Sequence, residues 1–377
     1  MKRKTVIRKM QTIAVTLALS VLPVKALADV KINKTNFPDP AFRQWLQKQY
    51  YGQDGVLTEK EINGITQINV YNMGISSLQG IEFFTAMTGL NCGENQLTEL
   101  DISKNMKLEN LYCNNNQLKA LDISENTNLS YLLCEENELT KLDVSKNTEL
   151  IQLRCFSNQL TELDVSKNTA LKILYCENNQ LTALDVSKNT ALETLTCNNN
   201  QLTSLDVSKN TALVMLYCPD NQLTELDVTH NTALVRLRCF SNRLTALDVS
   251  KNTELKFLYC YENQLRGEAM DALIGSLPKQ SGRLWVYFKD TDQYDMEPDG
   301  NVCTKANVEA ATAKGWQVYY HNNDEWEEYE GAETDGVANV GMDQADAPLY
   351  DLSGRKLQGK PDQKGIYVKD GKKILYR

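Results

Sequence analysis

The sequence has only two histidines, and neither lies in a segment that would complete a catalytic or metal-binding set. His230 replaces the lysine of a recurring Ser-Lys-Asn-Thr segment, as expected of a surface variant, and His321 stands among tyrosines and asparagines. A glycine-rich phosphate loop, a zinc-ligand spacing and the pattern of a catalytic triad are also missing. We therefore expect a protein that is not an enzyme and that uses no cofactor.

Long hydrophobic runs are missing after residue 28. Residues 1–28 combine a basic start, an apolar core too short to span a bilayer and the small-residue site Ala26-Leu27-Ala28, which predicts a secretory signal peptide. Its removal takes six of the 40 basic residues and none of the 49 acidic ones, leaving 34 against 49 and a formal net charge of −15. This acidity disfavours nucleic-acid partners. We expect an exported protein, secreted or at a bacterial cell surface, with no transmembrane segment.

Nine of the ten cysteines recur every 21 residues, and Cys303 is the remaining one. The nine are Cys92, Cys113, Cys134, Cys155, Cys176, Cys197, Cys218, Cys239 and Cys260. A fixed period of this length is typical of a solenoid, in which each unit buries its apolar face against its neighbours. Stacked strands lie about 4.8 Å apart with equivalent side chains pointing the same way, whereas a disulfide requires Cβ atoms about 3.8 Å apart that face each other. The spacing therefore predicts a column of reduced, buried thiols.

One unit, residues 171–191, has the pattern L-x-x-L-x-C-x-x-N-x-L-T-x-L-D-V-S-x-N-T-x. We expect Leu171, Leu174 and Cys176 to point inward around a short strand, and Asn179 to satisfy backbone groups at the next turn. The second half repeats the same pattern with strand-like or turn structure and leaves no room for a long helix. The aspartate of each unit forms a further column, Asp101 to Asp248, which we interpret as structural, with nearby Ser and Lys answering its charge, although a carboxylate column could collect cations.

These units resemble the 21-residue, cysteine-bearing leucine-rich repeats of internalin J and related bacterial surface proteins, over residues 65–266. The resemblance implies a leucine-rich-repeat solenoid, of the α/β class by convention but dominated by β-structure. It further implies a curved right-handed coil with a parallel sheet on its concave face. The function it implies is adhesion or ligand binding.

The N-terminal segment, residues 29–64, predicts a helical cap. Its second part resembles a calcium-binding helix-loop-helix, with Asp54, Thr58 and Glu61 at ligand positions and Gly55 at the glycine position. Tyr50 and Gly52 stand where two acidic ligands belong. We therefore interpret the segment as a degenerate, structural loop, with a working calcium site as the alternative.

The C-terminal third predicts three further segments. Residues 267–322 read as helix, strand, helix and strand, a mixed α/β cap over the last sheet edge. Residues 323–345 are acidic and poor in aliphatic side chains, which favours a linker. Residues 346–377 predict a β-hairpin around Asp370-Gly371. They resemble the C-terminal sorting segments of proteins exported by the type IX secretion route, and a small domain remnant is the alternative.

The residues next to each cysteine vary while the scaffold positions do not. Because side chains alternate along a strand, the residue before each cysteine, the residue two places earlier and the residue after it are expected on the concave face. Tyr, Phe and Arg are common in protein interfaces, and aromatic rings also stack on sugars. The predicted ligand-binding residues are Tyr112, Tyr131, Arg154, Phe156, Tyr175, Tyr217, Arg236, Arg238, Phe240, Phe257, Tyr259 and Tyr261.

The acidic residues Glu135, Glu136, Glu177, Asp220 and Glu262 lie among these positions, a mixture that suits a protein or glycan of mixed charge. We expect a monomer that binds a protein or glycan macromolecule, including one of host origin. The alternatives are a structural envelope or biofilm component and a glycan-capturing accessory protein. The segment "RCFSNQLTELDVSKNTAL" returns 84 residues later as "RCFSNRLTALDVSKNTEL", which is either plain duplication or two like subsites for a repetitive ligand.

Overall fold

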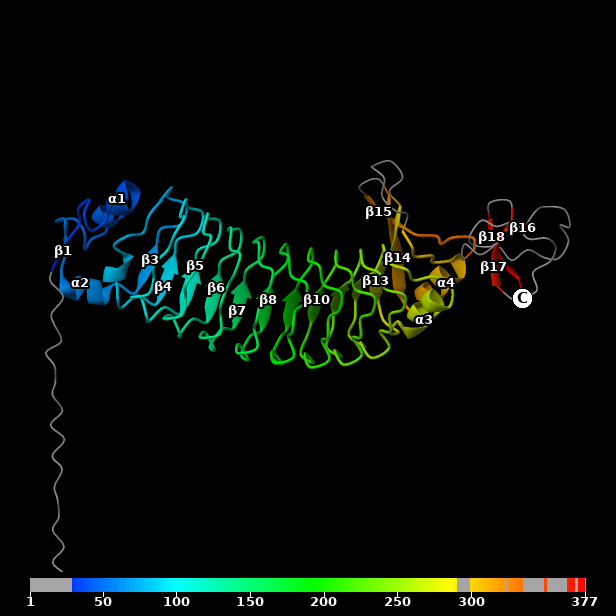
Figure 1. Cartoon of the computed structure of the whole chain (residues 1–377). Coiled ribbons are helices and arrows are strands. Elements are labelled where there is room, and N and C mark those ends of the chain that lie inside the picture. Colours follow the sequence, from blue (N-terminus) through cyan, green and yellow to red (C-terminus); the bar gives the residue numbers. More distant parts are fainter. Residues whose placement is uncertain are drawn as a thin grey trace, which may run out of the picture.

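The computed structural model describes residues 29–289, 299–322, 325–334, 349–350, 365–369 and 372–376. The middle of the chain forms a solenoid of stacked coils, each of which contributes one short strand to a parallel sheet along one side (Figure 1). The predicted fold class is thereby confirmed. The predicted signal peptide lies outside the described residues.

The main sheet has thirteen strands in the order β15-β14-β13-β12-β11-β10-β9-β8-β7-β6-β5-β4-β3. The coil strands are β3 (Gln67–Asn69), β4 (Gly89–Asn91), β5 (Asn110–Tyr112), β6 (Tyr131–Leu133), β7 (Gln152–Arg154), β8 (Ile173–Tyr175), β9 (Thr194–Thr196), β10 (Met215–Tyr217), β11 (Arg236–Arg238) and β12 (Phe257–Tyr259). The C-terminal strands are β13 (Gly282–Lys289), β14 (Trp316–Asn322) and β15 (Glu325–Glu328). Each coil strand pairs with the next in parallel and without a register shift.

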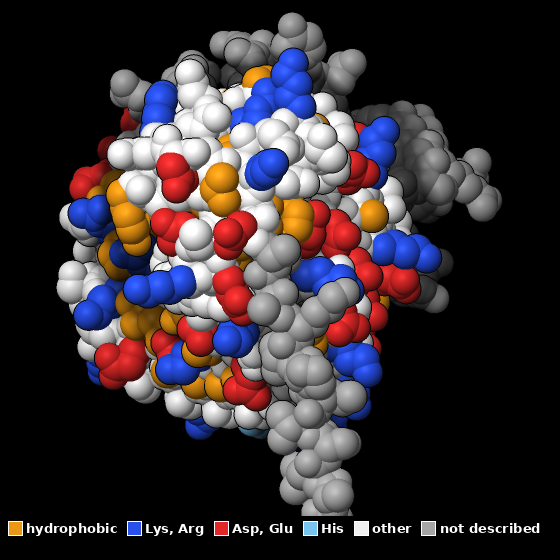
Figure 2. Space-filling model, turned by 90° about the vertical axis from the view of Figure 1, so that its left-hand side faces the viewer, with side chains coloured by type: hydrophobic (Ala, Val, Ile, Leu, Met, Phe, Trp, Pro, Cys, Tyr) orange, Lys and Arg blue, Asp and Glu red, His pale blue; other side chains and the backbone are white. Residues whose placement is uncertain are grey.

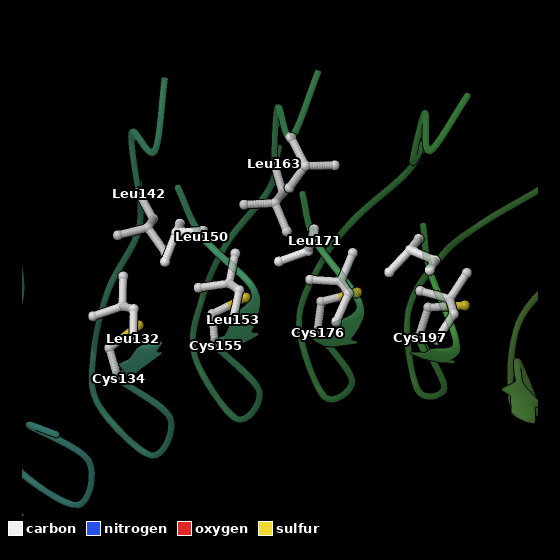
Figure 3. Close-up of a cluster of buried hydrophobic side chains, with 14 of the residues drawn as sticks. Leu132, Cys134, Leu142, Leu150, Leu153, Cys155, Leu163, Leu171, Cys176 and Cys197 are labelled. Atoms are coloured by element: carbon white, nitrogen blue, oxygen red, sulfur yellow. The ribbon is translucent and has the colours of Figure 1, made fainter. Parts of the chain in front are cut away.

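Each coil is held by apolar side chains that point inward at fixed positions. Leu171, Leu174 and Cys176 are fully buried, as predicted, and so are their equivalents in neighbouring coils (Figure 3). All ten cysteines are free and buried, which confirms the prediction of reduced thiols. The second residue after each cysteine adopts a positive φ, for example 53° at Asn178, and turns the chain out of the strand. Non-branched polar residues tolerate this conformation better than β-branched ones.

Two columns of buried asparagines connect the coils. The Asn179 side-chain nitrogen donates to the carbonyls of Cys155, Cys176 and Glu177 at 3.0 to 3.2 Å, and its oxygen accepts from the Leu160 N–H at 2.9 Å. In the second half of the coil, the Asn189 nitrogen donates to the carbonyls of Val165 and Asn168. Because buried backbone groups need partners, each column satisfies turns that no regular ladder reaches.

The N-terminal cap covers the first coil with α1 (Pro40–Lys48), α2 (Glu59–Gly64), the antiparallel pair β1 (Val30–Lys31) and β2 (Val56–Leu57), and the 3-10 helix η1 (Ile81–Phe83). Asp39 joins the cap to the solenoid: one oxygen accepts from the N–H groups of Ala41 and Phe42, and the other accepts from the N–H and hydroxyl of Ser76. Burial raises the pKa of Asp39, but these hydrogen bonds outweigh burial and hold it below the usual value. Acidic and basic side chains are interspersed over this end of the molecule (Figure 2), as expected of a surface that stops further stacking.

The C-terminal cap continues the solenoid before closing it. The helices α3 (Glu268–Ser276) and α4 (Lys305–Ala313) alternate with β13 and β14 as predicted. Val286 follows Trp285 as each ladder cysteine follows its strand, and the Asn301 amide bonds Cys260, Val286 and Leu265 as Asn263 bonds the preceding coil. This is a further coil, whose asparagine follows its strand by 15 residues instead of three.

The prediction of a linker over residues 323–345 is wrong at its start. Residues 325–328 form β15, which pairs antiparallel with β14. Trp326 lies 5.3 Å from the Tyr261 ring, and Glu327 accepts a hydrogen bond from the Tyr320 hydroxyl at 2.8 Å. One aromatic side chain and a paired strand are enough to order a segment whose acidic composition predicts disorder.

The C-terminal tail forms a separate three-stranded antiparallel sheet of β16 (Leu349–Tyr350), β17 (Gly365–Lys369) and β18 (Lys372–Tyr376). The predicted hairpin is present, with Lys369 opposite Lys372. Most of the remaining residues of the segments 323–345 and 346–377 lie outside the described residues.

Candidate binding face

The outward side chains of the sheet form one continuous surface. We call it the sheet face and define it by the first and third residues of β3 to β12, together with Arg283, Trp285, Gln317 and Tyr319, which continue these two columns in β13 and β14. The central residue of each three-residue strand is buried, whereas the flanking ones reach solvent to varying degrees. All predicted site residues except Phe156, Phe240 and Tyr261 belong to this face, and those three follow ladder cysteines at its margin.

Five side chains stack along the C-terminal half of the sheet face. The Arg238 guanidinium lies 4.6 Å from the Tyr217 ring centroid and 4.7 Å from that of Tyr259. The Tyr259 ring lies 3.8 Å from Trp285 at an interplanar angle of 4°, and Trp285 lies 5.4 Å from Tyr319 at 20°. We call this row the Tyr217–Tyr319 stack. Because Tyr259 and Trp285 have neighbours on both sides, their ring faces are covered and their edges point away from the sheet.

A second row of rings runs beside this stack. Phe240 and Tyr261 stack at 4.4 Å and 11°, and Tyr261 continues to Phe288 at 5.7 Å. Trp326 from β15 leans against Tyr261 and meets the Trp285 ring edge-on. Aromatic pairs of this kind contribute about 0.5–1.5 kcal/mol each beyond buried area. The C-terminal end of the sheet face is thus a rigid aromatic surface.

Sequence reasoning missed the residues that the cap adds to this surface, namely Trp285, Tyr319 and Trp326. Trp285 stands within "RLWVYF", a segment predicted as a cap strand, and a parallel extension of the sheet places it in register with Tyr259. The signal was therefore present in the strand prediction. Only the register shows that the cap strands carry the two columns further.

The two echoed Arg-Phe pairs lie on the same side of the molecule but have different neighbours. Arg154 contacts one ring, Tyr175, at 5.0 Å, whereas Arg238 lies between two. Phe156 has glutamates at the equivalent positions of both adjacent coils, whereas Phe240 has Pro219 on one side and the stacked Tyr261 on the other. The pairs therefore do not form two like subsites.

The acidic residues near the sheet face are drawn toward the protein. Glu135 is 6% exposed, and one of its carboxylate oxygens has no hydrogen-bond partner. Glu177 accepts a hydrogen bond from the Thr196 hydroxyl. Burial raises the pKa of Glu135, Glu177 and Asp220, and it raises the pKa of Asp299, beneath the second row of rings, to about 6.

These shifts predict that mild acid stabilises the protein. Where a carboxyl has a higher pKa in the folded state than in the unfolded chain, the folded state binds more protons and stability rises as the pH falls through that window. For Asp299 the window runs from about 6 down to the ordinary 3.8. We expect the thermal midpoint at pH 5 to exceed that at pH 7.5 by about 2 °C or more, measured by circular dichroism.

The control for this prediction is Asp299→Asn, which removes the titrating group and should flatten the acid rise. Below about pH 4 the sign reverses. The aspartate column, for example Asp164 and Asp185, has lowered pKa values because side-chain and backbone groups of the following serines donate to the carboxylates, so its protonation costs stability. A midpoint that falls steadily from pH 7.5 to 5 would contradict the prediction.

The other candidate ligand positions have structural partners. The aspartate column caps turns, since each carboxylate accepts from the N–H two residues later, which agrees with its structural interpretation. Asp54 accepts from Val56 in the same way, and Thr58 and Glu61 bond each other as the capping box of α2. Within the described segments, no three His, Cys, Asp or Glu side chains gather as metal ligands would, and no helix is long and apolar enough to cross a membrane.

The fold and its ladders define a leucine-rich-repeat solenoid protein. The functional domain of InlJ from Listeria monocytogenes, which includes a cysteine ladder, matches with a TM-score of 0.66 and 32% sequence identity over 80% of this chain and 72% of that chain. The internalin InlF from Listeria monocytogenes matches with a TM-score of 0.61 and 24% identity over 77% and 85% of the two chains. The chain belongs to the internalin J type of leucine-rich-repeat proteins.

A more distant match shares the fold alone. The leucine-rich-repeat ectodomain of the plant receptor kinase GASSHO1/SCHENGEN3 from Arabidopsis thaliana, solved in complex with CASPARIAN STRIP INTEGRITY FACTOR 2, has a TM-score of 0.51 and 23% identity over 58% of this chain and 30% of that chain. No protein-family profile and no curated protein matches the sequence.

Proposed function

We propose that this chain is an exported binding protein whose sheet face takes a macromolecular partner, with adhesion or host interaction as its role. The observation that carries the proposal is the Tyr217–Tyr319 stack together with the second row of rings beside it. Aromatic and arginine side chains are the residues that most often dominate binding energy in protein interfaces. Rigid stacking lowers the entropy lost when they bind.

A protein partner fits this surface better than a glycan. Sugar binding by aromatic residues uses an exposed ring face, and both faces of Tyr259 and Trp285 are covered. The outward ring edges and tyrosine hydroxyls suit polar and apolar groups of a polypeptide. The plant ectodomain solved in complex with its protein ligand has the same fold, which supports the proposal without identifying a partner.

Export is part of the proposal and rests on the signal-like residues 1–28. The resemblance of residues 346–377 to sorting segments would then place the protein at, or release it from, the cell surface.

The test is a binding screen of the chain from residue 29 onward against extracellular matrix proteins and a glycan array. A Tyr175→Ala, Tyr217→Ala, Tyr259→Ala variant is assayed beside it, with Thr148→Ala, Thr169→Ala, Thr190→Ala as the matched control at exposed positions of the turn segments. We expect a protein hit that the tyrosine variant weakens at least about tenfold and the threonine variant leaves unchanged. A partner bound equally by all three proteins would place the site elsewhere.

A further inference from the structure

The charge of the sheet face is opposite to that of the chain. The two columns of the face, from β3 to the matching positions of β13 and β14, contain four arginines, no lysine and no acidic residue. The four are Arg154, Arg236, Arg238 and Arg283. Elsewhere acidic residues predominate, and the aspartate column lies in the other half of each coil. In a chain with more acidic than basic residues, this segregation marks the face as electropositive.

Three of these arginines lie together at the aromatic end. Arg236, Arg238 and Arg283 come from neighbouring strands, and Arg236 and Arg283 are paired in register to either side of Phe257. The ion pairs in the described part of the chain join lysines to glutamates, namely Lys119–Glu138, Lys172–Glu193 and Lys305–Glu333. None of them involves an arginine of the sheet face, so these guanidinium groups carry charge without an internal counter-ion.

Arg238 is held ready to bind a carboxylate. Tyr217 and Tyr259 cover both faces of its guanidinium, at 4.6 and 4.7 Å, which fixes the plane of the group and leaves only its N–H edge free. Its Nε atom is buried and has no hydrogen-bond partner. A planar guanidinium with fixed faces and open N–H donors matches the two oxygens of a carboxylate. The Tyr259 and Trp285 ring edges beside it are the electropositive part of each ring.

The nearest acidic side chains do not cancel this charge. Asp220 and Glu262 stand two residues after their cysteines, at the positive-φ turn, and both interact with Ser241 there. They lie at the margin of the sheet face and not within its two columns.

We infer that the partner is an acidic polypeptide segment, whose carboxylates pair with Arg236, Arg238 and Arg283 while its apolar groups lie against the ring edges. This inference rests on the proposed function and identifies the chemistry of the partner for that same face. The acidic linker-like part of this chain offers no better occupant, because its ordered start, β15, already packs beside the face.

The experiment uses the chain from residue 29 onward and two fluorescent peptides, one of alternating Glu and Ser and one of alternating Gln and Ser. The variant Arg236→Gln, Arg238→Gln, Arg283→Gln is compared with Lys167→Gln, Lys188→Gln, Lys209→Gln, which loses the same charge from the exposed turn segments. We expect the Glu peptide alone to bind, more tightly at low salt, with at least about tenfold weaker binding in the arginine variant. The lysine variant should bind nearly as well as the wild type.

Each other outcome overturns the inference. Equal binding of the two peptides, equal loss in the two variants, no binding of the Glu peptide, or binding of heparin in its place would each do so, and the last would indicate a sulfated glycan. The proposed function is judged separately by the binding screen. A protein partner lost in the tyrosine variant but bound normally, and without salt dependence, by the arginine variant would leave the function standing and remove only the acidic segment.

Discussion

No cysteine of the native protein is expected to react with a thiol reagent, and all ten are expected to react once the chain is unfolded. Burial raises the pKa of the Cys92 and Cys303 thiols to about 12 and that of the seven cysteines from Cys113 to Cys239 and of Cys260 further still. The thiolate is the reactive form, and it is suppressed at every position. The measurement is a count with Ellman's reagent at pH 8, without and with guanidinium chloride.

The control is Lys167→Cys, which adds one exposed thiol in the middle of the solenoid. That thiol should react at once in the native protein while the other ten stay silent. The same experiment tests whether the column forms disulfides, since any such bond would lower the count in guanidinium chloride below ten. Rapid reaction of even one ladder cysteine in the native state would show that the coils open locally.

The second large effect is expected from Asn179→Ala. This substitution removes four hydrogen bonds that join three segments of backbone, to Leu160, Cys155, Cys176 and Glu177. A buried backbone group left without a partner costs about 1–3 kcal/mol. We expect the free energy of unfolding to fall by about 3 kcal/mol or more, measured by urea denaturation.

Two other variants frame this result. Asn178→Gly changes the adjacent exposed residue, whose φ of 53° glycine adopts freely, and should alter stability by less than about 1 kcal/mol. Asn189→Ala removes two side-chain hydrogen bonds instead of four, and its unpartnered oxygen contributes none, so its loss should be smaller. Equal losses for Asn179→Ala and Asn178→Gly would contradict the role of the asparagine column.

The coil could be predicted from the repeat because each side chain sees nearly the same surroundings in every unit. A period of 21 residues fixes which positions face inward, so the burial of Cys176 and the outward position of Tyr175 follow from one unit and apply to all. The turn residues follow as well, since only certain side chains suit the positive φ after each strand.

The cap could be predicted only in part, because it breaks the period. The asparagine of the last coil, Asn301, stands 15 residues after Val286, and no spacing rule connects the two before the chain folds. Composition was misleading at residues 325–328, where strand pairing and Trp326 outweigh an acidic sequence. Local pattern describes repeated contacts well and contacts made once poorly.

By itself, the sequence determined the solenoid, the reduced state of its cysteines and the columns of side chains on its sheet face, since these depend on contacts repeated in every coil. The tertiary structure alone decided how neighbouring columns meet. It placed Arg238 between Tyr217 and Tyr259, covered the ring faces of Trp285 and drew Glu135 out of solvent. The physical reason is that stacking and burial depend on which side chains stand next to each other in adjacent coils, 21 or more residues apart in the chain.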